Sequence, residues 1–277
     1  MKRNQSKFRK GFTLVEMLGV LAIIAILMSI VAVGVLSAIN RTRIVATMSN
    51  FKNLETAILG FVALPEAGGK LPLTKHSNAS KIFEATSQEA NATVNAFGGN
   101  QSDLHLEIPF IEVGLLERHP TWRVGNDGVA TGRVELGKEY LWNRNKSAFT
   151  TKETSSSTAR AGNDWTDYIR AECAPVDPAT TVVPGTYDAS GMMSTAGVNF
   201  MTDGTTRLSG GTRCAYVIIP GLSLKDATDL SKELNGALNE ADLKNPAANK
   251  QTKGRFVFAA PGTGEESVVG YYMLANL

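Results

Sequence analysis

The feature that most constrains this chain is a run without charged residues from residue 17 to residue 40, close to the N-terminus. The run contains no proline and exceeds the roughly 20 apolar residues that a helix needs to cross a bilayer. The first eleven residues carry five basic and no acidic side chains, and Arg41 and Arg43 follow the run. Because the more positive flank stays on the cytoplasmic side, this pattern predicts a single span with a cytoplasmic N-terminus.

Three interpretations of this segment compete. A cleaved secretory signal has a shorter apolar core of about 7–15 residues and a small-residue cut site after it, which Leu36-Ser37-Ala38 matches poorly. A plain signal anchor agrees with the length and the charge but gives no reason for Glu16. A carboxylate within a spanning helix costs free energy unless it has a partner or a function. The third interpretation supplies that partner.

The residues KGFTLVE at positions 10–16 resemble the processing site of type IV pilins and of the pseudopilins of type II secretion systems. The resemblance implies that a prepilin peptidase cuts after Gly11, that Phe12 is then N-methylated, and that the apolar helix stays in the mature protein. It also implies that Glu16 neutralises the N-terminal amine of a neighbouring subunit during assembly. Because opposite charges attract strongly at low dielectric and either alone is costly, such a pair would set the axial register between subunits.

The helix is predicted to continue beyond the membrane. Apolar residues recur at three- and four-residue intervals from Ile44 to Phe61, and Pro65 and two glycines then end the pattern. We therefore expect one helix over residues 12–64, transmembrane over about 12–40 and amphipathic afterwards. The resemblance implies a pilin fold of α+β class, in which this helix packs on an antiparallel β-sheet head over residues 65–277, after a cleaved leader of residues 1–11.

Within the head, five segments have the alternation or the β-branched and aromatic bias of strands. They are residues 104–108, 133–136, 215–219, 255–258 and 267–272. A short helix is predicted over residues 224–234, because Ser223 is a suitable N-cap and Gly236 suits the far end.

The chain has two cysteines, Cys173 and Cys214, both in the head. In an exported protein they meet an oxidising compartment and can pair. A disulfide would stabilise the head by roughly 3–4 kcal/mol on the chain-entropy model. It would close a glycine- and threonine-rich loop that resembles the disulfide-bounded region of pilins. The alternative is two buried, unpaired thiols.

The search for catalytic, metal or cofactor sites finds none. His76, His105 and His119 lack metal-ligand spacing, and no C-x-x-C motif is present. Some pseudopilins bind calcium near the C-terminus, but the scattered aspartates have no EF-hand pattern and are interpreted as solvated loop carboxylates: Asp164, Asp167, Asp177 and Asp203. A group of basic residues around Trp122 is interpreted as solvated charge, so no nucleic-acid partner is predicted: Arg118, His119, Arg123 and Arg133.

The resemblance thus implies a non-enzymatic structural subunit of a type IV pilus or a similar filament. Its partners would be copies of itself, a prepilin peptidase and methyltransferase, an inner-membrane assembly platform and membrane lipid. It would lie in the inner membrane with one span and then in an extracellular pilus or a periplasmic pseudopilus. The alternatives are a minor or tip pilin, a type II secretion pseudopilin, and, from another class, a monomeric membrane-anchored periplasmic binding protein or enzyme.

Overall fold

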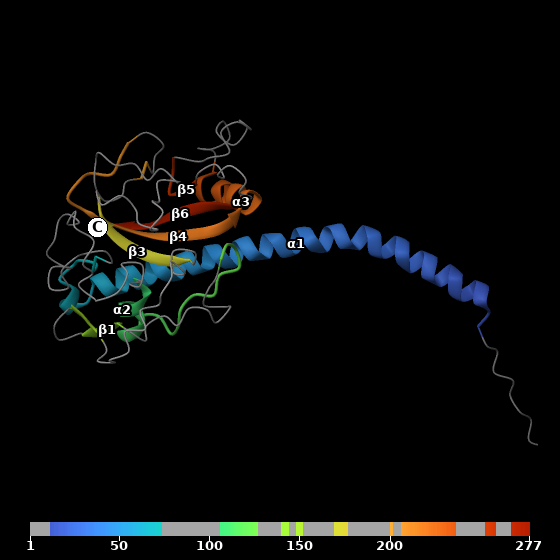
Figure 1. Ribbon diagram of the computed structural model, residues 1–277, viewed down its shortest axis with the longest axis horizontal. Helices are drawn as coiled ribbons and strands as arrows, with labels where there is room; N and C mark the ends of the chain where they lie inside the picture. Colours follow the sequence, from blue (N-terminus) through green and yellow to red (C-terminus); the bar gives the residue numbers. More distant parts are fainter. Residues whose placement is uncertain are drawn as a thin grey trace, which may run out of the picture. The chain divides into compact units, whose positions relative to one another are not determined.

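The computed structural model describes residues 12–73, 106–126, 140–143, 148–151, 169–176, 200–201, 206–236, 253–258 and 267–277. Within them lie the helices α1 (Leu14–Val62), α2 (Glu107–Glu112) and α3 (Leu224–Asn235) and a short 3-10 helix, η1 (Pro65–Ala67) (Figure 1). The strands of these residues are β1 (Tyr140–Asn143), β2 (Ala148–Thr151), β3 (Arg170–Pro175), β4 (Arg213–Ser223), β5 (Phe256–Phe258) and β6 (Ser267–Asn276). The chain divides into two units, Met1–Arg43 and Ile44–Leu277.

Helix α1 is continuous over 49 residues, so the long N-terminal helix predicted from the sequence is confirmed. It ends where its periodic pattern ends. Pro65 begins the 3-10 helix η1, and Gly68 takes a left-handed conformation with φ of 57° that closes it. Glycine adopts positive φ at little cost, which makes it the common residue at such a stop.

Four strands form an antiparallel sheet in the order β3-β4-β6-β5, and β1 and β2 form a separate antiparallel pair. The predicted α+β class is therefore confirmed. The predicted segments 215–219 and 267–272 lie within β4 and β6, and 255–258 begins one residue before β5, whereas β3 and the β1–β2 pair were not predicted. The segment 133–136 lies outside the described residues.

The strand predicted over residues 104–108 is wrong in its described part, because helix α2 begins at Glu107. Pro109 explains the difference. Its fixed φ and missing N–H group suit the first turn of a helix, where backbone N–H groups have no intrahelical partner. Leu106, just before the helix, still pairs like a strand residue, since its N–H donates to Ala171 O of β3 at 2.9 Å.

One face of the sheet packs against the second half of α1 and against α3. The helices contribute buried apolar side chains to a single cluster with strand residues, among them Phe51, Leu54, Ile58, Ala227 and Leu230. A smaller cluster covers the other face and includes Phe200, Tyr216, Ile218, Val257 and Tyr271. The alternation of neighbouring strand residues between the two clusters is the period of two expected for a sheet buried on both faces.

Helix α3 has the ends that the sequence predicts. Ser223 is its N-cap, and the Ser223 Oγ accepts a hydrogen bond from Asp226 N at 3.0 Å. At the other end Gly236 has a φ of 59°, and its N–H donates to Lys232 O. These two caps place Asn235 as the last residue of the helix.

Candidate functional site

The first turn of α1 is held by a reciprocal pair of side chains, Thr13 and Glu16. The Glu16 Oε2 accepts hydrogen bonds from Thr13 N at 2.9 Å and from Thr13 Oγ1 at 3.0 Å. In return, Glu16 N donates to Thr13 Oγ1 at 3.3 Å. This is the capping box of a helix N-terminus, in which a threonine and a glutamate three residues later satisfy backbone N–H groups that have no intrahelical partner.

The apolar part of α1 after this turn has no protein cover within the described structure. Phe12 is 78% exposed, and large apolar side chains from Leu14 to Ile39 are exposed as well. The helix is long and apolar enough to cross a membrane, and none of its most apolar 18-residue window is buried. Such a surface requires lipid or another apolar surface around it, which fits a membrane-anchored protein.

The structure places only some of the predicted processing residues. Gly11 lies outside the described residues, so the cut site itself has no geometry here. Phe12 directly precedes Thr13 at the start of the helix, and Glu16 lies in its first turn. The bond between Glu16 and Thr13 was missed in the sequence reasoning, although the T-x-x-E spacing that indicates a capping box is present in the sequence.

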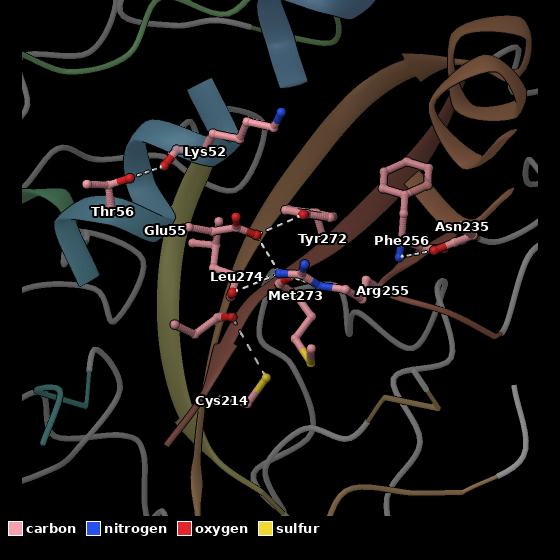
Figure 2. A network of polar contacts seen from close by, with 11 residues as sticks. Lys52, Glu55, Thr56, Cys214, Asn235, Arg255, Phe256, Tyr272, Met273 and Leu274 are labelled. Atoms are coloured by element: carbon pink, nitrogen blue, oxygen red, sulfur yellow. Dashed lines mark hydrogen bonds and ion pairs between the residues drawn. The ribbon is translucent and has the colours of Figure 1, made fainter. Parts of the chain in front are cut away.

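A second polar group, which we name the Arg255 network, joins the C-terminal half of α1 to the sheet (Figure 2). The Arg255 guanidinium donates to the Glu55 carboxylate of α1, which also accepts from the Tyr272 hydroxyl at 2.9 Å. The same guanidinium donates to Met273 O at 3.0 Å and to Leu274 O at 2.9 Å. One charged side chain therefore fixes both the helix and the end of β6.

Aromatic contacts surround the Arg255 network. The guanidinium carbon of Arg255 lies 5.1 Å from the centre of the Tyr272 ring, and Phe51 of α1 stacks on that ring at 4.2 Å. Cation–π and stacked aromatic contacts each add roughly 0.5–1.5 kcal/mol to the area they bury. This part of α1 is thus anchored to the head by polar and apolar contacts at the same point.

The predicted disulfide bond between Cys173 and Cys214 is not confirmed, because both cysteines are free in the structure. Cys173 lies opposite Ala215 in the β3–β4 ladder, whereas Cys214 lies opposite Ala174. Opposed residues point to the same face and successive residues to opposite faces, so this one-residue offset turns the two thiols to different faces of the sheet. Each joins a different apolar cluster.

Burial disfavours the charged form of both thiols. Loss of solvent raises the pKa of Cys173 to about 12 and also raises the pKa of Cys214. Since the thiolate is the reactive form, burial lowers the reactivity of both side chains in the folded head.

The described part of the chain contains no group of three or more residues suited to hold a metal ion. The four aspartates considered for calcium lie outside the described residues. Trp122 is only 5% exposed and packs on Phe51 at 5.5 Å, so its ring is not available to a ligand at the surface. Burial also lowers the pKa of His119 to about 4, which leaves that side chain neutral at pH 7. The Trp122 ring is therefore not at the centre of an exposed patch, and Arg133 lies outside the described residues.

An exposed apolar helix with an acidic, capped first turn, together with an antiparallel sheet, fits a membrane-anchored protein of the pilin type. A family model described as the prokaryotic N-terminal methylation motif matches residues 6–32. This is the prepilin-type motif of type IV pilins and pseudopilins, which supports a type IV pilin-like or pseudopilin protein. No curated protein and no solved structure matches the chain.

Proposed function

We propose that the chain is a structural subunit of a type IV pilus or a type IV pilus-like filament. In this proposal a prepilin peptidase removes residues 1–11, the new N-terminal Phe12 is methylated, and copies polymerise through the helix over residues 12–64. Residues 65–277 then form the head. An inner-membrane assembly platform and membrane lipid are the further partners.

The observation that carries the proposal is a carboxylate at the start of an otherwise apolar and uncovered helix, within the matched motif. Glu16 is the only acidic residue between Phe12 and Arg41. Its two hydrogen bonds come from Thr13 of the same chain, and all three bonds of this turn are exposed. No other part of the described structure covers these bonds, so a neighbouring subunit can reach the carboxylate. The carboxylate is therefore free to take a cationic partner from a neighbouring subunit once the surroundings become apolar.

The proposal is tested by mass spectrometry of filaments sheared from the cell surface. An abundant chain that begins with methylated Phe12 would support the subunit of a main filament. A chain found only in membranes with residues 1–11 still attached would contradict processing, and would favour a monomeric membrane-anchored binding protein or enzyme.

The length of the chain favours a second candidate within the same architecture. After loss of the first eleven residues most of the 277-residue chain remains, and its head begins at about residue 65. A head of this size suits a minor or tip pilin, or a pseudopilin of a type II secretion system. Traces of the processed chain among other filament proteins would support this candidate over a main subunit.

A further inference from the structure

Among the described residues, the outer strands of the four-stranded sheet are β3 and β5. A strand at a sheet edge directs alternate N–H and C=O groups away from its neighbour, where they can pair with a strand of another molecule. In this head, side chains and loop backbone occupy such groups on both edges.

On β5 the occupant is the Asn235 side chain (Figure 2). Its Nδ2 donates to Phe256 O at 2.7 Å, and its Oδ1 accepts from Phe256 N at 3.1 Å. These two hydrogen bonds reproduce the pair of N–H···O=C hydrogen bonds that two opposed residues exchange in an antiparallel ladder. Two residues earlier along the same edge, Gly254 N donates a hydrogen bond to Met201 O at 2.7 Å. A side-chain amide therefore takes the place of a neighbouring strand at Phe256.

The surroundings of Asn235 hold this amide in place. As the last residue of α3, it is 9% exposed, and its Nδ2 also lies 3.4 Å from Lys253 O. Gly254 leaves room for it, because a Cβ atom at that position would lie 2.4 Å from the Asn235 amide carbon. Gly254 also has a φ of 95°, which favours glycine. Asn235 and Gly254 are thus both suited to the contact between the Asn235 amide and the Phe256 backbone.

On β3 the occupants come from the segment before α2. Leu106 N donates to Ala171 O at 2.9 Å, and the Glu107 Oε1 accepts from Ala171 N at 3.0 Å. Here the carboxylate replaces the carbonyl of a neighbouring strand, and a backbone N–H supplies the donor. Ile169 N, two residues earlier, donates to Asn126 O at 3.0 Å. Outward backbone groups therefore have partners at Ile169 and Ala171 on one edge and at Gly254 and Phe256 on the other.

We propose that these contacts close the sheet against edge-to-edge pairing with the head of a second copy of this chain, so that self-association is left to α1. The proposal goes beyond the proposed function, because it concerns which surface of the head is withheld from association. Membrane anchoring holds many copies side by side at high local concentration. Under that condition an open edge would pair with another head.

The test uses the full chain in micelles of an uncharged detergent. Asn235→Ala removes both bonds to Phe256, and Asn53→Ala, at an exposed asparagine of α1, is the matched control. Hydrogen exchange at the Phe256 amide and sedimentation equilibrium are measured over a range of protein concentrations. We expect Asn235→Ala to exchange this amide about tenfold faster or more when dilute, the loss expected for one net hydrogen bond. At high concentration we expect it to dimerise and to regain protection at the same amide.

Protection that returns with dimerisation distinguishes edge pairing from association of helices in the micelle. A folded Asn235→Ala chain that stays monomeric, or that exchanges Phe256 as slowly as wild type, would overturn the proposal. Gly254→Ala provides a second route, because its Cβ displaces the amide while Asn235 is retained, and the same two results would count against the proposal. The wild type tests the proposal without any variant. Its Phe256 amide must exchange as slowly as the Tyr271 amide inside the β5–β6 ladder, and rapid exchange would contradict the edge closure.

Discussion

Glu107 should make the stability of the head depend on pH in the neutral range. Its side chain is buried, its Oε1 accepts from Ala171 N, and its Oε2 has no hydrogen-bond partner among the described residues. Loss of solvent raises the pKa of Glu107 from 4.5 to about 7. The hydrogen bonds from backbone N–H groups and the charge of Arg170 act in the opposite direction, while the charge of Glu172 adds to the rise.

The size and sign of the effect follow from linkage. Between pH 4.5 and about 7 the folded head holds a proton on Glu107 that the unfolded chain has released, so stability falls as pH rises through this window. The stabilisation is complete below pH 4.5 and lost above about 7. A shift of this size corresponds to about 3 kcal/mol of unfolding free energy.

Glu107→Gln tests this reasoning, because glutamine does not titrate and its side-chain oxygen can still accept from Ala171 N. We would unfold the full chain with urea in an uncharged detergent at pH 4, 6 and 8, and follow tryptophan fluorescence. Subtracting the variant from the wild type cancels all other titrating groups. We expect this difference to change by about 3 kcal/mol from pH 4 to pH 8, with wild type the relatively weaker at pH 8.

A matched control is Glu117→Gln, which alters an exposed glutamate on the loop after α2. It should leave the pH dependence of unfolding as in wild type. If Glu107→Gln has the same pH dependence as wild type, Glu107 does not titrate in this window and the reasoning from its burial is refuted.

Three further predictions concern leader cleavage, filament assembly and the two cysteines. Gly11→Val should block processing, because a β-branched side chain obstructs the cut site, and a normal mature mass in this variant would contradict the peptidase step. Glu16→Leu should be inserted and cleaved yet yield far fewer filaments, because the neighbouring amine loses its partner; a wild-type filament yield would exclude that role. Cys173 and Cys214 should resist an alkylating reagent in the native head and both react after unfolding without reductant, whereas a mature mass two hydrogens lower would show a disulfide.

The parts of the fold that could be predicted from sequence are those set by neighbours along the chain. A continuous periodic pattern and a proline stop are sufficient to predict α1, and Ser223 and Gly236 are sufficient to predict α3. The strand bias of β4, β5 and β6 is likewise local. In the candidate site, the motif around Glu16 was found because all of its signals lie within one short segment.

The parts that could not be predicted depend on pairing between distant segments. The disulfide was expected from compartment and loop length, but the β3–β4 register, which turns Cys173 and Cys214 to opposite faces, has no local signal. Arg255 and Asn235 were missed for the same reason. Each is an ordinary polar residue in the sequence and acquires a role only when β6 or β5 lies beside it. The strand predicted over residues 104–108 was wrong because Pro109 favours the start of a helix.

One kind of hydrogen bond recurs in the described part of this chain, and its surroundings decide what it can do at each place. At Glu16, Glu107 and Asn235 a side-chain oxygen accepts a hydrogen bond from a backbone N–H that has no backbone partner. At the two buried sites, breaking the bond strands a buried polar group at a cost of about 1–3 kcal/mol, so these partners resist exchange. At Glu16 the bond is not covered by the rest of the described structure, so a new partner can reach the carboxylate without opening the head. If both proposals hold, this difference in burial directs association to the helix and away from the sheet edges.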